Sequence, residues 1–320
     1  MNKTLIIAQK ELKDIMRSHV LLFTILLFVF LVIVSISVSS LIFHDQITQF
    51  DQSAELLKSL WKTQDLTRPT LYPLNLLRWV VNYIEIVGAI FGIFLGYMSA
   101  YREKFSRSLS LLLSRPVRSK NIIYGKLLGN SWFILMLLTA IGWFILILLS
   151  LIAGASIGGV EFLKIGIFTI SSSIYIIIFF LIAFLLCLYQ KNIVNALISS
   201  FLIWLVFALI IPQIGDTMDT DNQVSGWFFK SMWLSRADEF KVMDHFKTYE
   251  YIRTGTEHLS ITKHYERLEF ALFGVKKDFE WKTLNYIFQE KALDIFILVL
   301  FFLAVIHLNT QYIAKKLTIT

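Results

Sequence analysis

Three long apolar runs constrain the fold of this chain more than any other feature of its sequence. Residues 20–43, 127–153 and 168–189 contain no Asp, Glu, Lys, Arg or His. About 18 or more consecutive apolar residues are typical of a helix that crosses a lipid bilayer. Hydrophobic residues make up 56% of the 320-residue chain, above the roughly 45–50% of soluble domains. We therefore do not expect a soluble enzyme, a disordered chain or a secreted disulfide scaffold.

These three runs and three further apolar stretches predict six membrane-spanning helices. Each is about 20 residues long or longer, which suffices to cross a hydrocarbon core of about 30 Å at 1.5 Å per residue. Helices are expected because an unpaired peptide group in lipid is costly. The predicted fold class is therefore an all-α polytopic membrane protein, with spans at residues 20–43, 79–100, 127–153, 163–189, 193–212 and 292–309.

The Lys and Arg residues of the short loops orient these spans. Residues 101–126 contain seven bases and one acid, whereas residues 44–76 contain three bases and four acids. Loops rich in Lys and Arg stay on the cytoplasmic side of a membrane. We therefore expect both chain termini and residues 101–126 in the cytoplasm. The net charge of +7 then reflects topology, and no nucleic-acid partner is expected.

Two segments outside the spans are also expected to contain helices. Residues 3–18 place apolar side chains at helical spacing among charged ones, which is typical of an amphipathic helix at a membrane interface. Such a helix either anchors the orientation of the chain or packs beside a functional segment. Residues 213–291 can hold several helices on the outer side, as a candidate lid or a dock for an extracytoplasmic accessory protein.

The cytoplasmic loop at residues 101–126 is not a plain polar linker. A short helical stretch at residues 109–113 precedes Ser114, Arg115 and Pro116. The residue before a proline disfavours a continuing helix, so the chain is expected to turn there. A second helix then begins near Ser119 and runs into the third span. A short helix with a turn at its end suits the docking of a cytoplasmic partner.

The loop and the N-terminal helix resemble the ABC type-2 transporter permease family. The loop matches the family pattern, in order, at Glu103, Leu109, residues 111–114, Pro116, Val117, Gly125, Lys126, Leu128 and Gly129. The N-terminal helix matches it at Lys10, Glu11, Leu12 and Arg17. Two positions depart from it: the family's Gly-Thr is Arg107-Ser108 here, and its Ser-Arg is inverted to Arg118-Ser119. The LLLSRPV form is most similar to permeases linked to nitrous-oxide-reductase copper-site maturation and to gliding motility.

The resemblance implies the membrane subunit of an ATP-driven exporter or extractor in a prokaryotic inner membrane. It implies two copies of a separate cytoplasmic ATPase that bind Mg-ATP, and a second permease, commonly an identical copy. Spans one, two and five are expected to rearrange and open a path outward. The expected coupling residues are Glu103, Ser114, Arg115, Pro116 and Val117, beside Lys10, Glu11 and Arg17 of the interface helix. These residues alternatively only cap helices or snorkel to the interface.

The chain itself is expected to be neither an enzyme nor a metal-binding protein. It contains no GxxxxGK[ST] phosphate loop, so we expect no catalytic residue and no cofactor in it. The three histidines His245, His258 and His264 lack the spacing of a metal site, and the single cysteine, Cys187, forms no CxxC pair. Two other functions stay open: a membrane anchor that recruits an ATPase to an extracytoplasmic machine, and an ion-coupled secondary transporter.

Polar and small residues of the second span are candidates for translocation or packing. Asn82 and Glu85 lie about one turn apart on the same helical face, where they either function in translocation or reach the interface. Three glycines follow at four-residue spacing, which allows a neighbouring helix to approach closely. Gly88, Gly92 and Gly96 could serve a permease dimer or packing within the chain.

Overall fold

The structure, a computed structural model, describes residues 3–59, 72–105, 119–153, 157–218, 247–276 and 279–318. All regular elements in these ranges are helical. They are α1 (Lys3–Met16), α2 (His19–Ser59), η1 (Pro73–Leu77), α3 (Arg78–Tyr83), η2 (Ile84–Gly88), α4 (Ala89–Phe105), α6 (Ser119–Ala153), α7 (Gly159–Tyr189), α8 (Ile193–Leu205), η3 (Val206–Ile210), α9 (Ile211–Thr217), α12 (Lys247–Glu257), α13 (Ile261–Leu272), α14 (Leu284–Glu290) and α15 (Ala292–Thr318).

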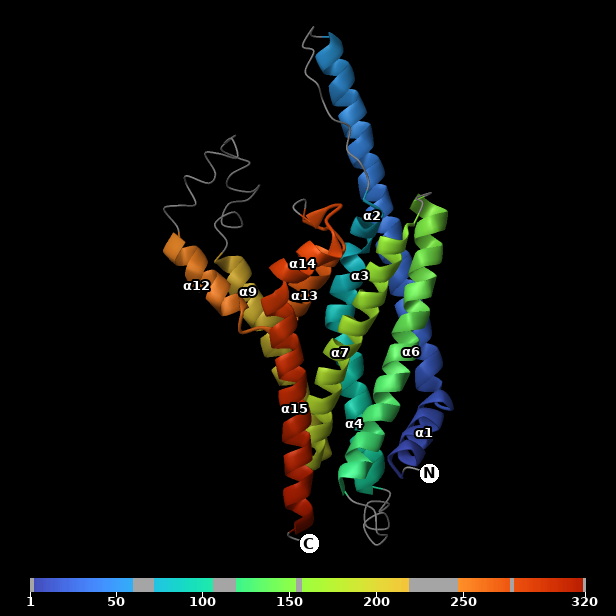
Figure 1. Cartoon of the computed structure of the whole chain (residues 1–320), viewed down its shortest axis with the longest axis vertical. Helices are drawn as coiled ribbons and strands as arrows, with labels where there is room; N and C mark the ends of the chain where they lie inside the picture. The colour runs from blue at the N-terminus through green and yellow to red at the C-terminus, as the bar shows by residue number, and fades with distance from the viewer. Residues whose placement is uncertain are drawn as a thin grey trace.

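Six helical segments in the described ranges are long and apolar enough to cross a membrane, which confirms the predicted fold class. In Figure 1 they lie side by side, and α1 and the last turns of α15 are at the same end of the bundle. We call this end the terminal end and the opposite one the distal end. The six segments are Leu22–Gln52, Pro73–Arg102, Tyr124–Leu151, Gly159–Tyr189, Ile193–Gly215 and Ala292–Tyr312.

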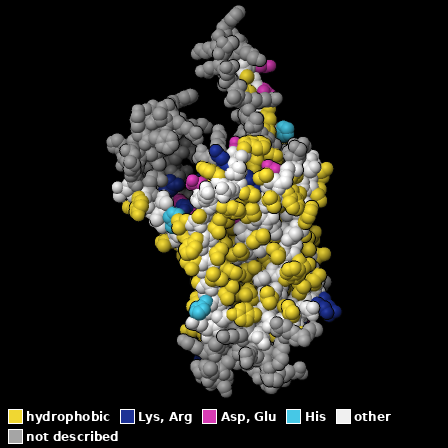
Figure 2. Space-filling view, in the orientation of Figure 1, with side chains coloured by type: hydrophobic (Ala, Val, Ile, Leu, Met, Phe, Trp, Pro, Cys, Tyr) yellow, Lys and Arg dark blue, Asp and Glu magenta, His cyan; other side chains and the backbone are white. Residues whose placement is uncertain are grey.

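The helix α7 lies at the centre of the bundle. Its most apolar stretch is 72% buried inside the protein, whereas those of α2 and α15 are only 22% buried. It packs against α4, α6, α8, α13 and α15. On the face shown in Figure 2, hydrophobic side chains cover the flank of the bundle between its two ends. The peripheral helices therefore turn apolar faces outward, as expected of a surface that contacts lipid.

The three glycines of the second span pack its helix against α7. A Cβ atom at Gly92 would lie 2.4 Å from the carbonyl oxygen of Ile176, and one at Gly96 would lie 2.3 Å from that of Phe180. Both distances are too short for any side chain, so the two backbones can approach this closely only at glycine. Gly88 faces the Ile176 side chain in the same contact. The stripe thus serves packing within the chain.

A Gly92→Ala variant is expected to lose about 1–3 kcal/mol of unfolding free energy, because the new methyl group collides with backbone that cannot rotate away. Gly166, on α7, is the matched control, since a Cβ there meets no atom within 4 Å. Unfolding of both variants by SDS titration measures the difference. Equal losses at the two positions would contradict the close approach of α4 and α7.

The first spanning helix continues well beyond the predicted span. The apolar run ends at residue 43, but α2 continues to Ser59, through much of the segment predicted as an outer loop at residues 44–76. No glycine or proline interrupts residues 44–59, so helix propensity carries the helix beyond the apolar run. In Figure 1 the end of α2 extends beyond the other helices at the distal end.

The segment before the last span contributes helices to the distal end of the bundle. Of these, α13 packs against α7, α15 and α3. The ring of Tyr265 stacks on that of Tyr175 with centroids 4.4 Å apart, and Phe273 packs on Phe168 at 4.9 Å. Ser260 caps the start of α13 by accepting a hydrogen bond from the backbone N–H of Lys263 at 3.2 Å. The helix therefore belongs to the core of the protein.

Candidate functional site

The helices α1, α4 and α6 meet at the terminal end in a cluster of charged and polar side chains. Lys126 Nζ lies 2.8 Å from Glu11 Oε1 and donates to the carbonyl oxygen of Ser99 at 3.3 Å. Arg102 Nη2 lies 3.4 Å from the second oxygen of Glu11. We call Glu11, Ser99, Arg102 and Lys126 the ionic cluster. It ties three helices that are far apart in the sequence to one another.

Three members of the ionic cluster are removed from solvent, while the side chain of Arg102 is 35% exposed. Lys126 is 2% exposed, Glu11 is 7% exposed and Ser99 is fully buried. A buried charge is tolerated only when it is paired and hydrogen-bonded, and removing one partner of such a pair typically costs about 3–5 kcal/mol. The contact between Glu11 and Lys126 therefore holds α1 on α6 in one defined position.

Two glycines of α6 allow α1 to come this close. A Cβ atom at Gly125 would lie 2.7 Å from the Cβ of Ile7, and one at Gly129 would lie 2.7 Å from the carbonyl oxygen of Ala8. Gly125 and Gly129 are four residues apart, so they lie on the same face of the helix, beside Lys126. The GKLLG sequence thus forms a smooth surface for α1 with one basic group next to it.

The ionic cluster brackets the loop that was expected to carry coupling. Arg102 lies one turn before the end of α4, and Lys126 lies about two turns after the start of α6. Of the predicted coupling residues, Ser114, Arg115, Pro116 and Val117 lie outside the described residues. Glu103 lies in α4, but its side chain is also outside them. If the two ends of the loop moved relative to each other, the contacts of Glu11 with Arg102 and Lys126 would be strained.

The structure separates the three predicted residues of the interface helix. Glu11 belongs to the ionic cluster, whereas Lys10 on α1 and Arg17 in the turn after it are exposed. Sequence reasoning missed Ser99, and it treated Lys126 as a family match and as a topology signal. A lysine between two glycines at helical spacing was the available signal, but nothing in the sequence identifies Glu11, 115 residues away, as its partner.

A second polar cluster is buried at the distal end between α13 and α7. Glu269 is fully buried, and its carboxyl group accepts a hydrogen bond from Ser171. Beside it, the hydroxyl groups of Ser172 and Tyr265 lie 2.7 Å apart. Burial raises the pKa of the Glu269 carboxyl to about 8, although the Ser171 hydrogen bond lowers it. The glutamate is therefore protonated near neutral pH.

The two polar residues predicted in the second span lie near this second cluster. Glu85 is 9% exposed, in the π-helical turn η2, and its backbone carbonyl accepts a hydrogen bond from the hydroxyl of Tyr175 at 2.9 Å. Asn82 is partly buried, and its Oδ1 atom has no hydrogen-bond partner among the described residues. Glu85 is thus more enclosed than a side chain that snorkels to the interface.

Three potential metal ligands lie close together at the distal end. One ligand atom each from His258, His264 and Asp294 falls within 4.8 Å of the others. However, His264 Nδ1 lies 2.6 Å from Asp294 Oδ1, and its Nε2 lies 2.9 Å from the carbonyl oxygen of His258. Both ring nitrogens of His264 are therefore already engaged by hydrogen-bond partners. Arg267 and Lys291 flank the group, so its surroundings oppose a metal cation.

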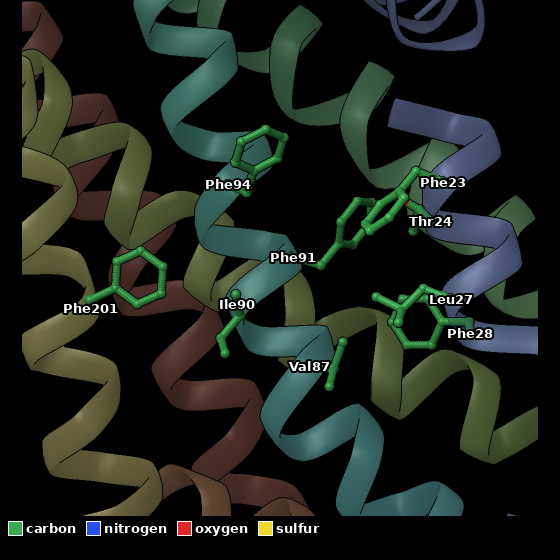
Figure 3. A pocket seen from close by; sticks show the side chains of 9 residues that line it. All are labelled: Phe23, Thr24, Leu27, Phe28, Val87, Ile90, Phe91, Phe94 and Phe201. Atoms are coloured by element: carbon green, nitrogen blue, oxygen red, sulfur yellow. The ribbon is translucent and has the colours of Figure 1, made fainter. Parts of the chain in front are cut away.

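An apolar pocket of about 470 Å³ lies between α2, the second span and α8. Figure 3 shows the ring of Phe91 pointing from α4 toward the side chains of α2, while Ile90 and Phe201 lie on the other side of α4. Phe28 and Phe91 pack edge to face with centroids 6.2 Å apart. The lining is apolar except for one hydroxyl group; it comprises Phe23, Thr24, Leu27, Phe28, Val87, Ile90, Phe91, Phe94 and Phe201.

The sequence matches a known protein family. The sequence model of the family described as "ABC-2 family transporter protein" matches residues 5–311. The matched range includes nearly all of α1, the ionic cluster, the loop at residues 106–118 and almost all of the six spanning segments. A search of the curated proteins finds no match to the sequence.

Proposed function

Because this chain belongs to the ABC-2 family of transporter proteins, we propose that it is the permease subunit through which an ATP-binding cassette transporter exports or extracts a substrate. The chain is a multi-pass membrane protein. Because residues 101–126 are rich in Lys and Arg, the terminal end would face the cytoplasm, and the resemblance to ABC permeases implies a prokaryotic cell. Two copies of a separate ATPase would bind Mg-ATP there, beside a second copy of the permease.

The observation that carries this proposal is the ionic cluster. Its residues come from the helix before the first span, the end of the second span and the start of the third. In the proposed cycle, ATP closes the ATPase dimer and displaces the loop between α4 and α6. Because Glu11 and Lys126 join α1 to α6, the displacement reaches the first span as well as the second. Nucleotide shifts the permease by binding one of its conformations more tightly than the other.

The position of the apolar pocket supports a substrate path along the spans that were expected to rearrange. It is lined by spans one, two and five, which correspond to α2, the η2–α4 segment and α8. Five of its nine lining residues are phenylalanines, so binding there would depend on the burial of apolar surface. This lining favours a substrate with an apolar portion over a fully polar solute.

Two other functions remain to be distinguished from the permease. An anchor that recruits an ATPase without moving a solute would use the same ionic cluster, but hydrolysis would then only remodel a partner. An ion-coupled transporter is favoured by one observation, the buried carboxyl of Glu269 between α13 and α7. That function predicts uptake or export driven by a pH gradient in proteoliposomes without ATP.

The test is to co-purify the chain with an ATP-binding cassette ATPase encoded beside its gene and to measure ATP hydrolysis. We expect the permease to stimulate hydrolysis, and Glu103→Ala or Pro116→Ala to reduce the stimulation about tenfold or more. Lys191→Ala is the control, because Lys191 is exposed in the turn between α7 and α8 at the same end. A wild-type chain that neither binds nor stimulates any such ATPase would refute the permease function.

A further inference from the structure

A small pocket lined with charged side chains opens at the distal end. Its volume is about 140 Å³, below the roughly 300–1,000 Å³ of sites for drug-sized ligands. It lies between α12, α13 and the segments on either side of α14, remote from the ionic cluster of the terminal end. Figure 2 shows Lys and Arg side chains gathered at this end of the molecule. Its basic residues are Arg253, Lys263, Arg267, Lys276 and Lys291.

Among the described residues, fewer acids than bases line the pocket. The two acids are Glu257 and Glu266, and Glu266 pairs with Lys263 at 2.8 Å. Glu257 pairs with Arg267 through one oxygen and with Arg253 through the other, at 3.2 Å. Burial alone raises the pKa of Glu257, but the hydrogen bond and charge of Arg267, and then those of Arg253, bring it below its ordinary value. The carboxylate of Glu257 is thus shared by two guanidinium groups.

The acid nearest to Lys291 is also shared. Lys291 Nζ lies 3.6 Å from Asp294 Oδ2, while the other oxygen of Asp294 lies 2.6 Å from His264 Nδ1. The second ring nitrogen of His264, Nε2, lies 2.9 Å from the carbonyl oxygen of His258. Asp294 is thus shared between Lys291 and His264.

Burial and neighbouring basic groups both lower the pKa of two groups at this end of the molecule. Partial burial lowers the pKa of Lys276, and the charges of Lys291 and Arg267 lower it further, against the opposing effect of Glu266 and Glu257. Burial is also the largest cause that lowers the pKa of His258, and the charge of Arg267 is the next. After burial, the charges of neighbouring basic groups are thus the next largest cause of both shifts.

We propose that this pocket binds a phosphate group, with Arg267, Lys276 and Lys291 as its donors. The three side chains come from three segments, α13, the turn after it and the residue before α15, and they line the same pocket. A compact anion supplies the negative charge that the acids lack, and charge-assisted hydrogen bonds to phosphate are among the strongest available. The phosphate belongs either to a free anion or to the headgroup of a membrane lipid. The inference concerns the distal end alone and does not depend on ATP coupling.

The test uses the full chain in dodecyl maltoside and compares two probes. Inorganic phosphate is titrated calorimetrically, and phosphatidylglycerol, added in phosphate-free buffer, is counted by native mass spectrometry. Lys276→Gln is expected to weaken binding about tenfold. Lys282→Gln is the matched control, since Lys282 is exposed at the same end but does not line the pocket. Lys276→Arg, which keeps the charge, should retain binding.

Each outcome of this comparison bears directly on the inference. Saturable phosphate binding that is weakened by Lys276→Gln but not by Lys282→Gln identifies a site for a free anion. The same pattern with phosphatidylglycerol alone identifies a lipid headgroup site. If neither probe binds the wild type, or if Lys276→Gln and Lys282→Gln bind equally well, the phosphate site is refuted. A melting curve of each variant excludes misfolding as the cause of a loss.

Discussion

A Glu11→Leu variant is expected to lose about 3–5 kcal/mol of unfolding free energy. The substitution leaves the ammonium group of Lys126, which is only 2% exposed, beside Ser99 but without the carboxylate that lies 2.8 Å away in the wild type. A Glu11→Leu/Lys126→Met double variant removes both charges, so we expect it to regain most of that loss. SDS titration of the two single variants and the double variant forms a double-mutant cycle that isolates the pair.

Asp14→Asn is the control for this cycle. Asp14 lies on the same helix and faces Arg102 at 3.8 Å, but its side chain is 41% exposed. An exposed ion pair contributes little, so the change in stability should stay within about 0.5 kcal/mol. If Asp14→Asn and Glu11→Leu destabilise the protein equally, burial of the ionic cluster is not what fixes α1.

The double variant also separates stability from coupling. Leucine and methionine can restore the packing of α1 on α6, but they replace a directional contact with a non-directional one. We therefore expect the double variant to fold and to bind the ATPase, while it stimulates hydrolysis less than the wild type. Full stimulation by the double variant would show that α1 serves only as an anchor for the orientation of the chain.

The spanning helices were predictable because their signal is local. Each apolar run carries its own length and composition, and a helix satisfies its peptide groups without partners elsewhere in the chain. The end of α2 was not predicted, because hydropathy ceases to mark the helix once the chain turns polar after Phe43. No glycine or proline follows there to end the helix, so the helix propensity of these residues extends it.

The contacts between helices were not predictable, because they depend on pairs that are distant in the sequence. Glu11 was predicted as an interface residue from a resemblance, yet its partner Lys126 is 115 positions away. Glu269 was missed altogether, because an acid in a polar segment gives no sign that its helix packs into the bundle. The run of Ser171, Ser172 and Ser173 within an apolar span was the one available hint that a polar group lies opposite.

Glu269 gives the prediction with the largest expected dependence on pH. Its pKa is about 8 in the folded protein, because burial disfavours the charged form, whereas the ordinary value for a glutamate is 4.5. Between these two values an unfolded chain has released the proton of this carboxyl and the folded chain retains it. The contribution to stability is therefore fully present below about pH 4.5 and is lost as the pH rises through about 8.

Between these two pKa values the wild-type protein should lose up to about 1.4 kcal/mol of unfolding free energy per pH unit because of this one group. Glu269→Gln cannot ionise, and its amide can still accept the hydrogen bond from Ser171. The pH dependence of the unfolding free energy that comes from this residue should therefore disappear. The variant should be the more stable protein at pH 8. Glu290→Gln, at an exposed position, should leave the slope unchanged. Unfolding by SDS titration from pH 5 to pH 8 measures all three proteins. Parallel curves for wild type and Glu269→Gln would mean that the carboxyl is ionised in the folded state, which requires a counter-charge that the described groups around it do not provide.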